Sequence, residues 1–391
     1  MTPESSYLRA LVRAFVAAEK TVPPPPSTVR WSRLRALLLG HHMVPALPPL
    51  IPPGAVPDGL AQELESVTRT LRLRTGLLLH ELSRILPALE AAGLRPVVLK
   101  GAALAHTVYA NPEDRSFLDL DVLVRRERID EACAILRSFG FEPREDPRSA
   151  AFFERHHFHR ILRKPSGVTV EVHWDLSRPS DYFRFDLDGW LKRSRLLDAG
   201  GMTMRTPSGG DQLLHAASQA LGERFSGLRR VLDAALLLRC GAGDDPGLVE
   251  RARSQGLATA LWVLLELARE ITEVEAPTGL ERGLRPRRAV RSCLASLRLS
   301  DRAVALDGSS PEVFKSLLRW LCAPNPLRAL AEVGRFVFPG EMHFLEAGYP
   351  PGNLPGPARR ALLSVRRSGT VVRIASHQLG RLVSRPPRVA S

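Results

Sequence analysis

The sequence predicts an α+β fold, with a small α/β core around a mixed sheet, N-terminal helices before the core and a helical domain after it. Two observations predict this arrangement. Between residues 93 and 206, short apolar or alternating runs are separated by turn signals, which is typical of strands joined by short helices. On both sides of this segment, apolar residues recur every three or four positions, which is typical of amphipathic helices. The expected regions are an N-terminal helical region (1–92), an α/β core (93–206), a helical domain (207–345) and a basic C-terminal tail (346–391).

The core elements are expected in the order strand, helix, strand, helix and hairpin. The expected strands cover 95–100, 117–124, 153–163 and 168–176, and the expected helices between them cover 102–109 and 129–139. The last two strands are joined by Lys164-Pro165-Ser166-Gly167, which is a hairpin turn signal. Before the core, residues 59–92 predict one long helix or two, because Pro87 can kink it. After the core, helices are expected over 211–221, 228–240, 247–271 and 311–321.

Composition and charge limit the classes of protein to which the chain can belong. The 391 residues are 44% hydrophobic and 25% charged, an ordinary globular balance that can bury a sizeable core. The formal net charge is +14, but residues 351–391 contain eight Arg and no acid, so this tail carries 8 of the 14. Such a tail favours weak contact with an anionic surface, or it is simply a loosely packed terminus. A general nucleic-acid-binding protein is disfavoured, because no reader motif is present.

Cysteine spacing and hydropathy favour a reducing compartment. Cys133, Cys240, Cys293 and Cys322 form no CxxC pair, so neither a cysteine zinc site nor a redox motif is indicated. Charged residues interrupt the first twenty positions, so we expect no signal peptide. The longest apolar window, Leu257–Leu267, is too short to span a bilayer. We therefore expect a cytoplasmic protein with no transmembrane segment.

Two aspartates lie on one face of the strand expected over 117–124. Because side chains alternate along a strand, Asp119 and Asp121 share one face, and Leu120 and Val122 face the other way. Carboxylates this close repel each other unless a cation or a proton lies between them. Mg²⁺ favours one or two carboxylates together with substrate phosphates. The alternative is a strand at the sheet edge whose two aspartates are solvated.

A third carboxylate comes from the strand expected over 168–176. There Val170 and Val172 face one way, whereas Glu171 and His173 face the other. Polar side chains on one face of a valine-rich strand are costly to bury unless they have a function. Three carboxylates that hold two metal ions make a phosphoryl-transfer site. We therefore expect Glu171 to join the two aspartates.

A glycine turn precedes the aspartate strand. Lys100 and Gly101 stand between the first expected strand and the helix over 102–109. Glycine lets a backbone approach a phosphate closely, and a helix N-terminus offers free N–H groups and the positive end of a dipole. We expect Lys100 and Gly101 to receive the triphosphate of a nucleotide, with Lys100 acting as a point charge.

Five segments, taken in order, resemble a known family. They are LKGAALAHTVY, RSFLDLDVLV, VEVHWDL, TPSGGDQLLHAASQA and LRRVLDAALLL, and they lie within residues 93–240. The glycine turn, the Asp-x-Asp strand and the later acid resemble the polymerase-β-type nucleotidyltransferase superfamily. The five segments together resemble the bacterial group called the uncharacterised nucleotidyltransferase family, and this match is far more specific than Asp-x-Asp alone. In one departure, the superfamily usually carries Gly-Ser after the first strand, whereas here Ala102 follows Gly101.

The resemblance implies a polymerase-β-type nucleotidyltransferase core that transfers a nucleoside monophosphate from an NTP to an acceptor. The acceptor, whether a small molecule, a peptide or a protein, is not indicated. Asp119, Asp121 and Glu171 would be the catalytic residues and would hold Mg²⁺, or Mn²⁺, with Glu171 also a candidate base. Arg115, which the resembling family also carries, would contact a nucleotide phosphate, or it is a solvated turn arginine. The main alternative is a catalytically degenerate binding or regulatory relative, against which the presence of all three acids argues.

Histidines cluster around the expected hairpin. They are His156, His157, His159 and His173. If the turn pairs Lys164 with Gly167, Phe158 lies opposite His173 and Arg160 lies opposite the third acid. His156 and His157 then point in opposite directions, which disfavours a metal site made by this cluster. His173 either lines the carboxylate site or packs within the structure.

Charged residues on the later helices have local explanations as well as functional ones. Asp211 resembles a helix N-terminal acid. Arg230 and Asp233 have the (i, i+3) spacing of an ion pair on one helix. Arg229 could instead reach a nucleotide phosphate if the helical domain closes over the nucleotide.

Overall fold

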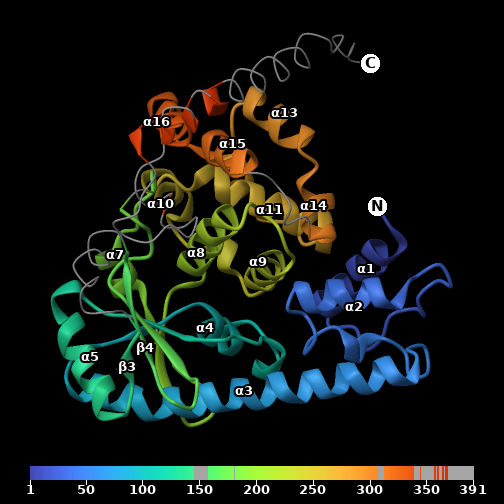
Figure 1. Cartoon of the computed structure of the whole chain (residues 1–391), viewed down its shortest axis with the longest axis horizontal. Coiled ribbons are helices and arrows are strands. Elements are labelled where there is room, and N and C mark those ends of the chain that lie inside the picture. The colour runs from blue at the N-terminus through green and yellow to red at the C-terminus, as the bar shows by residue number, and fades with distance from the viewer. Residues whose placement is uncertain are drawn as a thin grey trace. The chain divides into compact units, whose positions relative to one another are not determined.

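The computed structural model describes residues 1–144, 157–179, 181–306 and 312–338, together with isolated positions between 344 and 368. The chain forms two compact units. The first contains Met1–Arg285 and Leu299–Gly308, and the second contains Pro286–Arg298 and the chain from Ser309 onward. The predicted α/β core therefore lies in one unit with the helices on either side of it. Figure 1 shows the elements in chain order.

A seven-stranded mixed sheet forms the centre of the first unit, in the strand order β3-β4-β5-β2-β1-β7-β6. The strands are β1 (Val97–Val98), β2 (Leu120–Leu123), β3 (Glu142–Pro143), β4 (His159–Arg163), β5 (Thr169–His173), β6 (Arg195–Asp198) and β7 (Thr203–Thr206). β2 pairs parallel with β5, and β1 pairs parallel with β7, while the other neighbours are antiparallel. The α+β fold with a mixed sheet and flanking helices is confirmed.

The first unit also contains helices before, between and after these strands. They are α1 (Pro3–Ala17), α2 (Trp31–Gly40), α3 (Asp58–Ala91), α4 (Lys100–Thr107), α5 (Ile129–Ser138), α7 (Leu187–Arg193), α8 (Gly209–Gly222), α9 (Arg229–Arg239), α10 (Leu248–Ser254), α11 (Ala258–Thr272), α12 (Thr278–Leu284) and α14 (Leu299–Ala305). α3 is one continuous helix of 34 residues with Pro87 inside it. The single helix expected over 247–271 is wrong: it is divided into α10 and α11, because Gly256 adopts a left-handed φ of 78° between them.

The second unit is helical in its described part. It contains α13 (Arg288–Ser296), α15 (Glu312–Cys322) and α16 (Pro326–Val337). Arg319 of α15 pairs with buried Glu332 of α16 at 2.7 Å between Nε and Oε2. Most of the predicted basic tail over 346–391 lies outside the described residues. Within the described residues, no helix combines the length and the apolar run that crossing a membrane requires.

The apolar core packs the sheet against α3, α4 and α5. Leu82 and Leu86 of α3, Leu136 of α5, and Val122 and Val170 of the sheet belong to one buried cluster. Each fully buried Val or Leu contributes roughly 1.5–3 kcal/mol. Because strand side chains alternate, this packing directs the intervening polar side chains of β2 and β5 to the opposite face of the sheet. Apolar packing on one face thus positions the polar cluster on the other.

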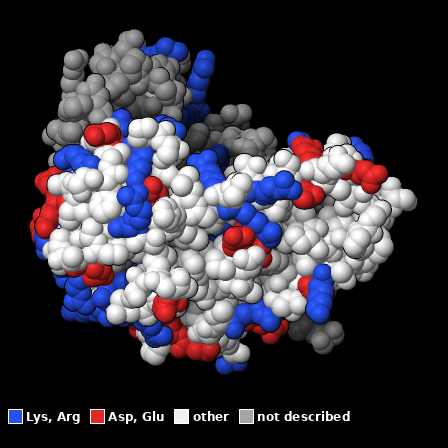
Figure 2. Space-filling model, turned by 90° about the horizontal axis from the view of Figure 1, so that it is seen from below, with Lys and Arg blue, Asp and Glu red and all other residues white. Residues whose placement is uncertain are grey.

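The surface seen in Figure 2 mixes both signs of charge. Lys and Arg side chains are interspersed with Asp and Glu on this face and do not gather into one large patch. A surface that binds nucleic acid without sequence preference usually concentrates positive charge on one face or stripe. The visible face therefore does not support the nucleic-acid-binding alternative.

Candidate active site

Parallel pairing of β2 with β5 brings the predicted carboxylates together. Asp121 lies directly opposite Glu171 in the register, and both side chains project from the face that the apolar core does not cover. Asp119 comes just before β2 and is half-buried. Asp121 is only 2% exposed, and the Glu171 side chain is 16% exposed. The structure therefore gathers Asp119, Asp121 and Glu171 into one cluster, as the alternation predicted.

Lys100 provides the positive charge within this carboxylate cluster. Its Nζ donates to Asp121 Oδ1 at 2.5 Å and to Glu171 Oε2 at 3.4 Å. The Lys100 backbone has φ 49°, a left-handed conformation that is uncommon for a residue other than glycine. Such a conformation costs on the order of 1 kcal/mol, which the rest of the fold must offset. Lys100 is the first residue of α4, so the strained position lies where the chain passes from β1 to the helix beside the carboxylates.

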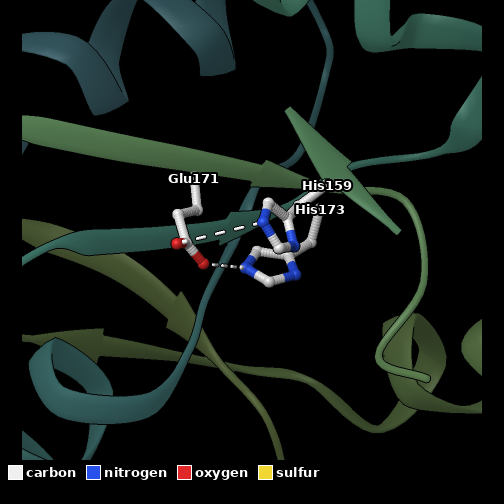
Figure 3. Close-up of side chains that lie close together, drawn as sticks. All are labelled: His159, Glu171 and His173. Carbon is white, nitrogen blue, oxygen red and sulfur yellow. Dashed lines mark ion pairs between the residues drawn. The ribbon is translucent and has the colours of Figure 1, made fainter. Parts of the chain in front are cut away.

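Two histidines border the same cluster. His173 Nε2 lies 2.8 Å from Asp121 Oδ1 and 3.3 Å from Glu171 Oε2, and its side chain is fully buried. His159 Nε2 lies 4.0 Å from Glu171 Oε1. Figure 3 shows Glu171, His159 and His173 pointing toward one another from two neighbouring strands. The interpretation of His173 as a residue that lines the carboxylate site agrees with this geometry.

The hairpin register differs by one residue from the predicted register. His159 lies opposite His173, whereas the sequence interpretation placed Phe158 there. The reason is the turn: Gly167 N donates to Lys164 O, Gly167 has a left-handed φ of 88°, and Lys164 N donates to Val168 O. The loop therefore has three residues and ends on a left-handed glycine. A one-residue shift exchanges the two faces of β4, which moves His159 to the carboxylate side.

Burial and mutual repulsion act most strongly on Asp119. Burial, followed by repulsion from Asp121 and Glu171, raises the pKa of Asp119 to about 6. Burial also opposes ionisation of Asp121, but the Lys100 ammonium and the hydrogen bond from His173 outweigh it and lower the pKa of Asp121. Asp119 accepts no hydrogen bond from the residues that the structure describes. It is therefore the acid of this cluster with the least compensation for its charge.

The other two titratable groups of the cluster shift in opposite directions. Burial opposes the charge of Glu171, yet the hydrogen bond from His173 and the charge of Lys100 hold its pKa well below the usual range. Burial and the nearby Lys100 oppose the charge of His173, but its bonds to Asp121 and Glu171 raise its pKa. The described cluster thus favours a charged ring on His173 between two ionised carboxylates.

Gly101 is required by close packing. A Cβ at this position would lie 2.4 Å from Phe117 Cβ, a separation that real Cβ atoms do not adopt. Phe117 leads into β2, so this contact sets α4 against the strand that carries the two aspartates. The absence of a side chain at Gly101 therefore has a structural explanation beside the predicted phosphate contact.

Arg115 lies in a different polar network. Its Nε and Nη2 donate to Asp233 Oδ1 and Oδ2 at 2.8 and 2.9 Å, and its side chain is 4% exposed. Tyr109 Oη donates to the same Asp233 at 2.8 Å. A bidentate arginine–carboxylate pair is strong and directional. The predicted contact of Arg115 with a nucleotide phosphate would require this buried pair to open, and the structure does not bring Arg115 to the carboxylate cluster.

The remaining charged candidates also have local partners. Arg230 donates to Glu223 Oε1 at 3.0 Å and lies 3.8 Å from Asp233, so the predicted (i, i+3) pair forms but is the weaker contact. Asp175 accepts from the backbone N–H groups of Leu176 and Ser177, which makes it a turn residue. The described groups provide no hydrogen-bond acceptor for the buried Nε of Arg229. His156 lies outside the described residues.

His159 is the site residue that sequence reasoning did not bring to the carboxylates. The signal was present in the turn, because Pro165-Ser166-Gly167 suits a three-residue loop with a left-handed final glycine. That loop type fixes the register and therefore the face on which His159 lies.

Comparisons with known proteins give one family match and a distant structural likeness. A family model described as "Uncharacterised nucleotidyltransferase" matches residues 27–273. Among solved structures, the chain is similar to an antigenic nucleotidyltransferase-like protein from Paracoccidioides brasiliensis, with 16% sequence identity and a TM-score of 0.32. That alignment covers 52% of this chain and 94% of the other. No curated protein matches the sequence at a significant level.

Proposed function

Because this chain belongs to the uncharacterised nucleotidyltransferase family, we propose that it transfers a nucleoside monophosphate from an NTP to an acceptor, with Mg²⁺ or Mn²⁺ held by Asp119, Asp121 and Glu171. One observation carries the proposal: the parallel register sets Asp121 beside Glu171, with Asp119 two residues away on the same strand segment. These are oxygen ligands on one face of a rigid sheet, which suits a hard divalent cation.

The chemistry of the cluster fits a cation. Asp119 has a raised pKa because its charge is poorly compensated, and Asp121 already binds the one ammonium in the described cluster, that of Lys100. A bound divalent ion would relieve this repulsion and withdraw charge from the phosphoryl oxygens and the departing pyrophosphate. Lys100 has a flexible four-carbon stem, so its ammonium can move from Asp121 to the triphosphate when a metal ion replaces it.

The proposed reaction balances as a single displacement. An acceptor hydroxyl oxygen forms a bond to the α-phosphorus, the bond from that phosphorus to the bridging oxygen breaks, and pyrophosphate leaves with the electron pair. The hydroxyl proton must pass to a base. Glu171 has a lowered pKa, which favours its role as a metal ligand over its role as that base. Asp119 accepts no hydrogen bond from the described residues, so an oxygen lone pair that the metal ion does not use can accept this proton.

A specific observation favours a second candidate function, a binding protein that has lost catalysis. The 2.5 Å pair of Lys100 with Asp121 already places a positive charge where a metal ion would lie. In a relative that has lost catalysis, the ion pair of Lys100 with Asp121 would persist in the presence of metal ions, because no metal ion would displace the ammonium.

The discriminating experiment uses NTPs labelled at the α- or the γ-phosphate, the full-length protein after chelator treatment, added Mg²⁺ and a cell extract as the acceptor source. Nucleotidyl transfer labels a product from the α-labelled NTP only, and Asp121→Asn abolishes it. The matched control is Asp130→Asn, because that carboxylate is 90% exposed and lies outside the cluster. Failure of the protein to bind any NTP or to label any acceptor would leave the binding-protein alternative.

A further inference from the structure

β4 and β5 bring two imidazole rings against Glu171 at the border of the carboxylate cluster. His159 lies opposite His173, and Glu171 stands two residues before His173 on the same face. One ligand atom from each of the three residues lies within 4.8 Å of the others. The ring centroids of the two histidines are 4.9 Å apart with an interplanar angle of 47°. Three side chains that commonly bind metal ions thus converge from two strands (Figure 3).

The spacing fits a metal ion after a small contraction. His173 Nε2 is 3.3 Å from Glu171 Oε2, and His159 Nε2 is 4.0 Å from Glu171 Oε1. Bonds of about 2.0–2.2 Å in a tetrahedral arrangement place ligand atoms roughly 3.3–3.6 Å apart. One carboxylate distance already lies at this value, and the other exceeds it by less than about 1 Å. All three ligand atoms lie within 4.8 Å of one another, so a contraction of roughly 1 Å brings them to coordination distance. Binding also requires His173 Nε2 to release the proton that it shares with Asp121.

The three side chains are largely buried, and one nitrogen of each histidine ring is unpaired. The His173 side chain is fully buried, and those of His159 and Glu171 are 15% and 16% exposed. In each ring, Nδ1 is buried and has no hydrogen-bond partner among the described residues. Buried polar atoms are normally paired, and an unpaired one often marks a missing water or ion. Nε2 of each ring faces Glu171, so each Nδ1 remains available for a partner outside the metal site that would orient the ring.

We propose that His159, Glu171 and His173 bind a divalent first-row transition metal ion of the Zn²⁺ and Mn²⁺ type, at a site beside the Asp119–Asp121 pair. Imidazole nitrogen suits such ions, whereas Mg²⁺ prefers an all-oxygen environment. Glu171 has one oxygen toward each histidine, and Oε2 is also 3.4 Å from Lys100 Nζ, so it connects this histidine site to the carboxylates. The inference shares Glu171 with the proposed function but does not require nucleotidyl transfer.

The test measures metal binding by the full-length, chelator-treated protein without nucleotide. Co²⁺ serves as the probe because its visible absorption bands report nitrogen and oxygen coordination. We expect one Co²⁺ per chain, displaced by Zn²⁺ and resistant to excess Mg²⁺. His159→Gln should weaken Co²⁺ binding by about 100-fold or more, since even loss of an outer-sphere partner costs about 10–100-fold. The matched control is His80→Gln, at an exposed position of α3.

Two further measurements keep the test independent of one variant. X-ray absorption of the wild-type protein with Zn²⁺ should show two imidazole ligands, and it needs no substitution. Asp119→Asn should retain Co²⁺ affinity within about threefold, because Asp119 is not among the three ligands, although it abolishes nucleotidyl transfer.

The outcomes separate this proposal from the proposed function. Displacement of Co²⁺ by Mg²⁺ as readily as by Zn²⁺, an all-oxygen absorption spectrum, or unchanged binding by His159→Gln would each overturn the histidine site. If His159→Gln shows unchanged Co²⁺ binding and also transfers nucleotide normally with Mg²⁺, the proposed function stands and the histidine site does not. Tight Co²⁺ binding by a protein that binds no NTP would support the histidine site and overturn the proposed function.

Discussion

Replacing Asp119 by asparagine is expected to stabilise the metal-free protein while it abolishes nucleotidyl transfer. The carboxylate is half-buried near Asp121 and Glu171, and its pKa is raised from 3.8 to about 6. A raised pKa means that the folded state disfavours the charged form. This penalty is absent below about pH 4, grows as the pH rises to about 6 and is constant above that. An asparagine at this position would carry no charge and would not incur the penalty.

The pKa shift sets the size of the effect. A shift of about two units corresponds to at most about 3 kcal/mol, at 1.36 kcal/mol per unit. Because Asp119 is partly exposed, solvent screening reduces this, and we expect roughly 1–2 kcal/mol near pH 7. For a unit of this size, each kcal/mol moves the melting temperature by about 2 °C. The expected rise is therefore roughly 2–4 °C.

The assay compares thermal melting of the wild-type protein and Asp119→Asn from pH 4 to pH 8 in chelator, and again with Mg²⁺. The two melting temperatures should converge near pH 4 and separate as the pH rises. Mg²⁺ should raise only that of the wild type, because the variant has lost a ligand. The exposed Asp130→Asn serves as the control and should shift stability by less than about 1 kcal/mol. A variant that melts at or below the wild type at pH 7 in chelator would refute the assignment of a poorly compensated, half-buried charge to Asp119.

Three other changes test separate parts of the structure. Glu171→Gln should bind NTP within about tenfold of the wild type, which is about 1.4 kcal/mol. It should lose at least about 100-fold in turnover, because it removes a ligand of the catalytic metal ion. Calorimetry measures NTP binding and the transfer assay measures turnover, and full turnover would contradict the assignment. Gly101→Ala should lower the free energy of unfolding by about 1–3 kcal/mol, because its Cβ would overlap a packed side chain. The control Gly76→Ala lies in open space on α3 and should be neutral or stabilising by up to about 1 kcal/mol. Chemical denaturation measures both, and equal stabilities would refute the packing argument. Asp233→Asn should lower the free energy of unfolding by about 3–5 kcal/mol, since it leaves the buried Arg115 guanidinium without its counter-charge. A decrease of less than about 1 kcal/mol in the same measurement would show that the pair is not buried in solution.

Local periodicity was sufficient to predict much of the carboxylate cluster. Alternation assigned Asp121 and Glu171 to the polar faces of their strands, and the structure places both on the face opposite the apolar core. Regular apolar spacing also predicted the long helix α3. These features depend only on the two-residue period of a strand and the 3.6-residue period of a helix. Both periods can be read from a single sequence.

Non-local packing decided the rest. Arg115 and Asp233 are separated by 118 positions, so no local pattern indicated that the arginine is buried in a pair with α9. Lys100, at the start of α4, contacts Asp121 on β2 from a left-handed backbone conformation, which no local pattern in the sequence indicated.

The sequence by itself determined which face of each strand is polar, and hence which acids could share a site. The tertiary structure decided which strands are neighbours and in what register. β2 pairs with β5 across about fifty residues, and the three-residue turn before Val168 brings His159, not Phe158, opposite His173. The physical reason is that side-chain direction follows from backbone period alone. Pairing and register depend instead on the packing of distant segments and on the conformation of one glycine, where a slip of one residue exchanges the two faces.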